Sequence, residues 1–199
     1  MIYILFDLEA TCWEREACNG RIGEIIEIGA VKLGENTEQL DTFQTFIKPT
    51  KNPILSEFCV GLTTIKQSDV DSAPYFAEAM LSFEDWICGE NGDFSDIMLI
   101  SWGYYDKNAI LQECNLKHYY GNIISMLKNH RSLKHDFAKF RSKRCGMEKA
   151  LEILGIPLEG THHRGIDDAL NIAKIFKAVF EEWQEFLLKD DSTYEEEKQ

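Results

Sequence analysis

MIYILFDLEATCWE, residues 1–14, places two acidic residues directly after a run of apolar ones. Ile2–Phe6 predicts a buried strand, and Asp7 and Glu9 follow it with one residue between them. Alternate residues of a strand point to the same face, so both carboxylates are predicted on one face at the strand end. A buried ionised carboxylate is costly unless a positive charge compensates it. The stretch therefore predicts either a strand end at the surface or a cation site.

The composition is typical of one globular domain that works away from membranes. The chain has 199 residues, of which 44% are hydrophobic and 28% are charged. This length is enough for a single well-buried core. No apolar stretch is long enough to span a bilayer, and Asp7 and Glu9 interrupt the one stretch that could act as a secretion signal. We therefore expect a soluble, cytoplasmic protein with no membrane partner.

The six cysteines are scattered, and no two of them have the CxxC spacing of a zinc or redox site. This pattern favours reduced thiols in a reducing compartment. Cys12 and Cys18 lie close to the opening motif. Whether either of them binds a metal stays open from the sequence.

The chain is strongly acidic, but its charge is unevenly distributed. A net charge of −13 argues against a broad basic surface that holds long nucleic acid. Residues 128–149 nevertheless carry eight of the 21 Lys and Arg residues and only two acidic ones. That stretch is either a solvated helix surface or a local phosphate-binding patch. Residues 189–199, KDDSTYEEEKQ, are expected to form a disordered acidic tail after a single domain at 1–188.

Strand signals come first along the chain, and helical signals follow them. Ile2–Glu9, Glu24–Leu33 and Asp41–Ile47 predict an antiparallel meander, because short connections join them. Two further strands are predicted at Asp96–Trp102 and Asn122–Ser125, and a loop around LSEFCVGLT. Helices are predicted at Ala73–Gly89, Asp106–Cys114, Leu133–Arg141, Gly146–Leu154 and Gly165–Leu188. This order predicts an α/β fold with a mixed five-stranded sheet and helices on both faces.

Two more acidic positions adjoin apolar segments. Asp106 follows the stretch LISWGYY, near the start of a predicted helix. In the last predicted helix, the 3.6-residue period separates Asp167 from Asp168. Asp167 shares its face with the polar residues Asn171, Lys174, Glu181 and Glu185, whereas Asp168 shares its face with the apolar residues Ile172, Ile175, Val179 and Phe186. Asp168 is therefore predicted to point inward, and Asp167 to be a solvated residue of the first turn.

Asp7, Glu9, Asp106 and Asp168 form a set of inward carboxylates with no matching buried Lys or Arg in the pattern. Oxygen ligands of this kind suit Mg²⁺ or Mn²⁺. Two such ions about 4 Å apart can bridge a phosphate, activate water and stabilise a leaving oxygen. Any one of these acids alone is typical of a water-exposed strand end or helix cap. The set of four favours a metal site.

Three motifs that carry these residues resemble, in the same order, those of the DEDDh family of 3′–5′ exonucleases, the DnaQ-like group on an RNase H-like fold. The motifs are FDLEATC at 6–12, SWGYYDKNAIL at 101–111 and HRGIDDALNIAKI at 163–175. The first motif and the segment LSEFCVGLTTIKQSDVDSA look closest to the enhanced-RNAi and histone-mRNA exonuclease branch. The resemblance covers the chain from about residue 2 to residue 180.

The resemblance implies a metal-dependent 3′–5′ exonuclease that releases nucleoside 5′-monophosphates. It implies that two Mg²⁺ or Mn²⁺ ions are held by Asp7, Glu9, Asp106 and Asp168, and it gives Glu9 a catalytic role as well. The family's histidine lies five residues before the final aspartate, which selects His163 over His162 as the general base. A neutral imidazole near pH 7 suits that role. The alternative for His163 is a helix-capping or surface histidine.

Substrate contacts are also implied by the resemblance. The candidates are Glu9, Ala10, Thr11, Leu62, Trp102 and His163. Leu62 lies in the segment that resembles the branch's terminal-base wedge, and Trp102 could stack on a base, although either side chain could equally belong to the core. The second motif departs from the family pattern at Tyr104 and Tyr105, so the shape of that loop stays open.

The same motifs bear on the substrate and on the alternative functions. Similarity to the RNA branch favours RNA 3′ ends, with a DNA-directed exonuclease of identical chemistry as the alternative, because the contact to a 2′-OH is not visible in a sequence. A catalytically weak nucleic-acid-binding module is disfavoured because all four carboxylates and the histidine are present. An acidic metal-buffering protein would explain the charge but not the ordered motifs. Since the sequence shows no separate nucleic-acid-binding domain, a targeting partner protein is expected.

Overall fold

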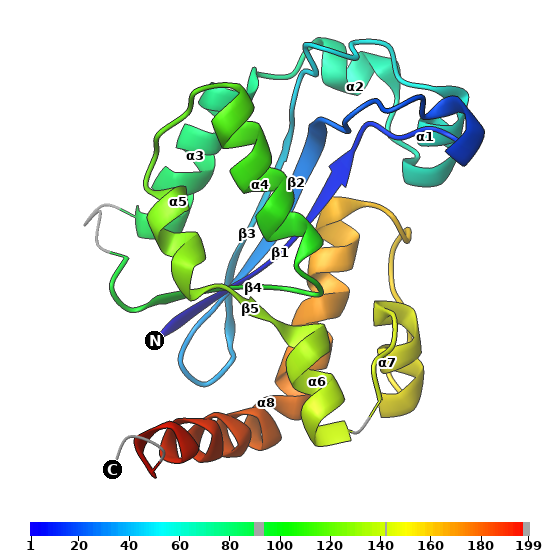
Figure 1. Cartoon of the computed structure of the whole chain (residues 1–199). Helices are drawn as coiled ribbons and strands as arrows, with labels where there is room; N and C mark the ends of the chain where they lie inside the picture. The colour runs from blue at the N-terminus through cyan, green and yellow to red at the C-terminus, as the bar shows by residue number, and fades with distance from the viewer. Residues whose placement is uncertain (90–93, 142, 197–199) are drawn as a thin grey trace.

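A mixed five-stranded sheet forms the centre of the computed structural model, which describes residues 1–89, 94–141 and 143–196 (Figure 1). Its strands are β1 (Ile2–Ala10), β2 (Ile25–Leu33), β3 (Gln39–Phe46), β4 (Ile97–Ser101) and β5 (Arg131–Ser132). The order is β3-β2-β1-β4-β5. β1, β2 and β3 pair antiparallel, whereas β4 pairs parallel to β1 and β5 parallel to β4. The predicted mixed sheet with an antiparallel start is confirmed.

Helices connect the strands and cover them. They are α1 (Glu57–Thr63), α2 (Gln67–Asp71), α3 (Phe76–Cys88), α4 (Tyr105–Leu116), α5 (Ile123–Met126), α6 (Leu133–Arg141), α7 (Met147–Leu154) and α8 (Gly165–Glu196), with the 3₁₀ helices η1 (Arg15–Ala17) and η3 (Leu127–Asn129). The five predicted helices correspond to α3, α4, α6, α7 and α8. α1 lies where the sequence predicts a loop. It begins there because the Ser56 hydroxyl caps it, accepting a hydrogen bond from the Cys59 backbone N–H at 3.0 Å.

The strand predicted at Asn122–Ser125 is wrong, because this segment begins α5. Glu84 on α3 explains the difference. Its carboxylate accepts hydrogen bonds from the backbone N–H groups of Asn122 at 3.0 Å and Ile123 at 3.1 Å, so it satisfies amides at the start of a helix. The fifth strand follows instead at Arg131–Ser132. A two-residue strand carries too little periodicity to be recognised in the sequence.

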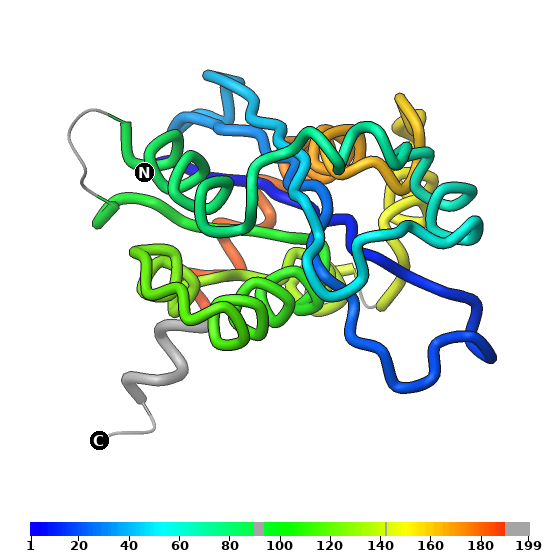
Figure 2. Tube along the Cα trace, turned by 90° about the horizontal axis from the view of Figure 1, so that it is seen from above, coloured from blue at the N-terminus to red at the C-terminus, as the bar shows by residue number. Residues whose placement is uncertain are grey.

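Two layers of helices enclose the sheet, one on each face (Figures 1 and 2). On one face, Tyr3 and Leu5 of β1 pack in a core with residues of α6, α7 and α8. On the other face, Ile4 and Phe6 pack in a second core with residues of α3, α4 and α5. This alternation buries β1 on both sides, and the predicted helices on both faces are confirmed.

α8 is longer than predicted, since it continues to Glu196 through most of the segment expected to be a tail. Residues 197–199 lie outside the described residues, as do 90–93 and 142. The division of the chain at residue 188 and the disorder of 189–199 stay predictions. None of the helices in the described part of the chain is both long and apolar enough to cross a membrane.

Candidate active site

Strand β1 ends with two carboxylates on the sheet face that α8 covers. Tyr3 and Leu5 pack against α8 on this face, and the alternation of the strand extends the face to Asp7 and Glu9. Glu9 is buried and Asp7 is half-buried. The prediction that both carboxylates lie on one face is therefore confirmed.

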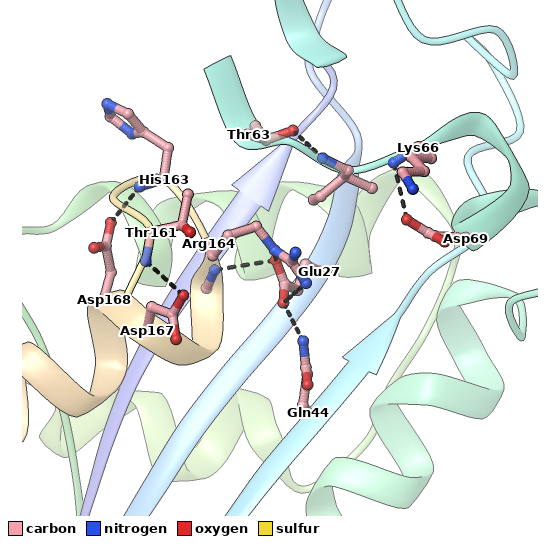
Figure 3. Close-up of polar contacts among 12 residues, drawn as sticks. Glu27, Gln44, Thr63, Lys66, Asp69, Thr161, His163, Arg164, Asp167 and Asp168 are labelled. Atoms are coloured by element: carbon pink, nitrogen blue, oxygen red, sulfur yellow. Dashed lines mark hydrogen bonds and ion pairs between the residues drawn. The ribbon is translucent and has the colours of Figure 1, made fainter. Parts of the chain in front are cut away.

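Asp168, in the first turn of α8, completes a group of three carboxylates. Its exposed fraction is 5%. Its carboxylate accepts a hydrogen bond from the backbone N–H of His163 at 3.1 Å (Figure 3). One carboxylate oxygen from each of Asp7, Glu9 and Asp168 lies within 4.8 Å of the other two. The helical register that selects Asp168 as the inward aspartate is thus confirmed.

Asp167 has a different task from its neighbour, because it closes the loop that precedes α8. Its Oδ2 accepts a hydrogen bond from the backbone N–H of Thr161 at 2.8 Å (Figure 3). The solvated position predicted for Asp167 needs correction, since the residue is half-buried and Asn171 on the same face is fully buried. Asn171 hydrogen-bonds the backbone N–H and C=O of Glu159, so the loop between α7 and α8 folds over this face.

Asp106 reaches the same cleft from the first turn of α4. It is 5% exposed and lies outside the 4.8 Å group formed by the other three carboxylates. The cleft has a volume of about 430 Å³, and its titratable lining includes Asp7, Glu9, Asp106, His162, His163 and Asp168. The fold therefore brings all four predicted carboxylates and the predicted histidine to one place.

Three of these carboxylates, Asp7, Glu9 and Asp106, disfavour their ionised forms when no cation is bound. Burial, followed by the charges of Asp106 and Asp168, raises the pKa of Asp7 well above its usual range. Burial and then the charge of Asp168 raise the pKa of Glu9 to about 8. Burial also raises the pKa of Asp106 to about 6, although hydrogen bonds from Ser101 and from the backbone of Leu8 oppose the rise. Such groups are the ones for which a divalent cation is the most effective partner.

Glu27, a residue that the sequence analysis did not select, anchors α8 beside the cleft. It is fully buried in the middle of β2, and its carboxylate accepts hydrogen bonds from the backbone N–H of Gly165 at 3.0 Å and from Nε of Arg164 at 3.2 Å (Figure 3). Gln44 donates a third, at 2.6 Å. A Cβ at Gly29 would lie 2.1 Å from the backbone of Gly165, so only glycine lets the helix start approach the sheet this closely. The signal in the sequence was an acid between the apolar residues Ile26 and Ile28 of this strand.

Two adjacent histidines form one edge of the cleft. The rings of His162 and His163 stack with their centroids 4.0 Å apart. Nδ1 of His162 lies 3.0 Å from Oδ2 of Asp168, whereas His163 contacts Asp168 through its backbone N–H. One ring nitrogen of each histidine and one oxygen of Asp168 lie within 4.8 Å of one another. Burial, followed by the charge of His162, lowers the pKa of His163, which favours a neutral imidazole near pH 7.

Of the other expected substrate contacts, only Trp102 lines the cleft. Trp102 lines the cleft but also packs against Phe137 in the core. Ala10, Thr11 and Leu62 are not among the residues that line it. Thr11 is buried, and its hydroxyl accepts a hydrogen bond from the backbone N–H of Glu24 at 2.9 Å. Leu62 lies on α1 with 36% of its surface exposed.

The lining residues that were not selected from the sequence include Tyr105, Lys134 and Met147. Tyr105 was noted only as a departure from the family motif. Lys134 and Met147 come from α6 and α7, and only the folded arrangement brings these helices to the cleft. Within the described residues, the groups of three side chains that could hold a metal include neither Cys12 nor Cys18.

Comparisons with known proteins agree with this geometry. The family model described as Exonuclease, RNase_T, matches residues 4–176. The chain belongs to this exonuclease family. Exonucleases of this family depend on metal ions, and the four carboxylates in the cleft are of the kind that such ions require.

Individual relatives place the chain more closely within the exonuclease family. It is 33% identical to rat "3'-5' exoribonuclease 1" over 86% of this chain and 50% of the relative. It is 29% identical to "3'-5' exonuclease Snipper" of Drosophila melanogaster over 96% of this chain and 73% of the relative. The chain thus spans about half the length of the rat protein.

Among solved structures, the nuclease domain of 3'hExo, "a DEDDh family member, bound to rAMP", is 31% identical with a TM-score of 0.82, and the match covers 91% of this chain and 92% of that one. The RNase H-like exonuclease fold and the DEDDh family expected from the motifs are therefore confirmed.

Proposed function

We propose that this exonuclease-family chain removes nucleotides one at a time from the 3′ end of nucleic acid, RNA in the first place, and releases nucleoside 5′-monophosphates. The observation that carries the proposal is the convergence of Asp7, Glu9, Asp106 and Asp168 with His163 in one cleft. The relatives named as 3'-5' exoribonucleases and the neighbour solved with rAMP support RNA as the substrate class.

Mg²⁺ or Mn²⁺ fits the residues of the cleft. Asp7, Glu9 and Asp168 present oxygen atoms within 4.8 Å of one another, and protons or cations relieve their mutual repulsion. We propose two ions per site, with Asp106 as a further ligand on the α4 side. When bound, the ions would supply neutralisation of phosphate charge and a lower pKa for the attacking water. The backbone N–H of His163 donates a hydrogen bond to Asp168 and holds that side chain in place.

The side chains of the chain have separate tasks in the proposed reaction. His163 accepts the proton of the attacking water, which its lowered pKa favours. Trp102 and Tyr105 border the space for the terminal nucleoside, and Lys134 adds the only Lys or Arg charge among the residues that line the cleft. The oxygen of the attacking water bonds to phosphorus as the bond from phosphorus to the 3′ oxygen of the preceding nucleotide breaks. The phosphate therefore stays on the 5′ oxygen of the released nucleotide, and the shortened strand ends in a 3′ hydroxyl.

His163→Asn is expected to lower kcat by about 10²- to 10⁴-fold with little change in KM, because it removes the general base and not the metal ligands. His162→Asn is the matched control and is expected to cost less than about tenfold. Steady-state hydrolysis of a 3′-labelled RNA measures both. If His162→Asn has the larger effect, the proton acceptor is His162.

Metal binding is expected to strengthen as pH rises from 6 to 9. In the folded chain the pKa values of Glu9 and Asp106 are raised to about 8 and about 6. Their protonated forms therefore favour the metal-free fold, and this contribution to stability is complete at low pH. That contribution is lost as pH rises through these two values. Cations compete with the same protons, so the increase in Tm caused by Mg²⁺ is expected to be larger at pH 8.5 than at pH 6, as measured by thermal unfolding. Glu9→Gln is expected to weaken this dependence, and a pH-independent increase in Tm would contradict it.

The function itself is tested with matched RNA and DNA oligonucleotides labelled at the 5′ end and incubated with Mg²⁺, Mn²⁺ or EDTA. The proposal predicts a ladder that shortens by one nucleotide at a time from the 3′ end, with faster shortening of RNA, and no reaction in EDTA. Faster shortening of DNA would make the chain a DNA exonuclease. Release of the 5′ label as a mononucleotide before any ladder forms, or cleavage in EDTA, would overturn the proposal.

A further inference from the structure

Two exposed tyrosines lie where the chain enters α4, Tyr104 at the cap and Tyr105 as the first helical residue, and neither supplies a metal ligand or a proton acceptor in the proposed reaction. Tyr104 and Tyr105 are 46% and 61% exposed. Tyr105 borders the cleft, and Tyr104 directly precedes it in the chain. The Tyr104 ring packs on the His135 ring of α6, with centroids 4.6 Å apart and an angle of 35° between the planes. Nδ1 of His135 is fixed in turn by the Ser132 hydroxyl at 2.7 Å. Tyr104 thus carries an aromatic ring that is supported from behind and open in front.

Basic side chains lie around the same pair of rings. Lys134 lines the cleft beside His135, and Arg144 is exposed in the segment between α6 and α7. Arg144 stands two residues before Gly146, which also lines the cleft. After burial, the positive charges of Arg144 and then Lys134 lower the pKa of His135. Neither Lys134 nor Arg144 has an acidic partner in the described part of the chain.

Three other basic residues of the stretch 128–149 are paired with acids. Arg131 binds Asp136 at 2.9 Å, Arg141 binds Glu182 at 2.6 Å, and Lys149 binds Glu152. The structure therefore separates these three charges, which are used within the fold, from those of Lys134 and Arg144, which are available to a ligand. This division is not visible in the sequence, where all of them look alike.

Charge and shape together indicate what this surface binds. The cleft interior is acidic, so a nucleic acid strand that enters it must be held outside it by positive charge. An exposed aromatic face next to basic side chains is the usual surface for an unpaired base and its phosphate. A base in a duplex is already stacked and paired, so it cannot use such a face.

We propose that Tyr104, Lys134, His135 and Arg144 form a strand-guiding rim, which binds the nucleotides directly 5′ of the terminal one in a single strand. Tyr104, supported by His135, stacks on an unpaired base, while Lys134 and Arg144 contact the adjacent phosphates. The rim rests on the proposed function for its ligand, a nucleic acid 3′ end, and adds a preference for unpaired ends.

Binding without cleavage tests the rim. The affinity of the full chain for a fluorescent six-nucleotide single-stranded RNA is measured in EDTA by anisotropy at several salt concentrations. Tyr104→Ala is expected to weaken binding about tenfold, and Tyr104→Trp to restore it, because alanine removes the aromatic face on which the base stacks and tryptophan supplies one. Lys134→Gln and Arg144→Gln are each expected to reduce the slope of log K against log salt by about 0.7.

Lys149→Gln is the matched control, since it removes the same charge from a residue paired with Glu152. It is expected to leave both affinity and slope unchanged. A blunt duplex is expected to bind more weakly than the single strand and to be insensitive to Tyr104→Ala. The rim is overturned if Tyr104→Ala, Lys134→Gln and Arg144→Gln all bind the single strand like the unaltered chain. It is also overturned if the duplex binds as tightly as the single strand and loses as much affinity on Tyr104→Ala.

Failure of the rim and failure of the proposed function are distinguishable. A chain that binds single strands through the rim but degrades none in Mg²⁺ or Mn²⁺ retains the rim and loses the exonuclease proposal. A chain that degrades RNA equally well with and without the rim residues retains the exonuclease proposal and loses the rim. Because Tyr104, Lys134 and Arg144 are all partly or fully exposed, their variants are expected to keep the Tm of the unaltered chain, which thermal unfolding verifies.

Discussion

Asp168→Asn is expected to lower exonuclease turnover by about 10³-fold or more while the chain stays folded. The carboxylate is 5% exposed and has an oxygen within 4.8 Å of oxygens of Asp7 and Glu9, so the substitution removes charge from the centre of the cation site. A bound metal contributes several kcal/mol to transition-state stabilisation, and about 1.4 kcal/mol corresponds to a factor of ten in rate. Single-turnover degradation of 3′-labelled RNA measures the loss, and circular dichroism verifies the fold.

Asp167→Asn is the control for this prediction, because it makes the same chemical change one residue away. Asp167 accepts a hydrogen bond from the Thr161 N–H and does not belong to the group of three carboxylates. The side-chain oxygen of an asparagine can accept the same hydrogen bond. We expect its turnover to stay within about threefold of the unaltered chain. Equal losses for the two variants would mean that the cleft tolerates no change at the start of α8, and the separate role of Asp168 would be refuted.

Glu27→Ala is expected to destabilise the chain by about 3 kcal/mol and to abolish activity with it. The substitution leaves the Arg164 guanidinium without its buried partner and the backbone N–H of Gly165 without an acceptor. Both groups lie at the start of α8, so the helix that carries Asp168 loses its attachment to β2. The free energy of unfolding in urea measures the effect.

Glu27→Gln separates the hydrogen bonds of this anchor from its charge. The amide oxygen can still accept the Gly165 N–H, so we expect a loss of only about 1 kcal/mol and measurable residual activity. A Glu27→Ala variant as stable as the unaltered chain would show that α8 is held by its apolar contacts alone. In that case the close approach of Gly29 to Gly165 would position the helix without Glu27.

The positions of the cleft carboxylates on β1 and α8 were predictable because each has a strong local signal. The alternation of β1 places Asp7 and Glu9 on one face, and the helical period distinguishes Asp168 from Asp167. Both patterns depend on geometry that regular backbone fixes over a few residues. The same reasoning went too far at Asn171, which shares a polar stripe but is buried by a loop. Periodicity describes a helix and carries no information about which loops fold back onto it.

Features that depend on distant segments were not predictable. Glu27 gains its meaning only from Gly165 and Arg164, which lie far along the chain. The strand expected at Asn122–Ser125 is a helix because Glu84, on another helix, supplies the capping acceptors. Lys134 looks like any other residue of a basic stretch until α6 is packed beside the cleft. In each case the deciding contact is tertiary, and local propensity gives it no signal.

The most direct test of the account is a time course of a single-stranded RNA that carries its label in the 3′-terminal nucleotide. In Mg²⁺, the account predicts that a labelled nucleoside 5′-monophosphate is the first product, and that neither EDTA nor the Asp168→Asn variant allows its release. Label that first appears in longer fragments, or as a nucleoside 3′-phosphate, would contradict a carboxylate-held metal site that acts on the terminal phosphodiester.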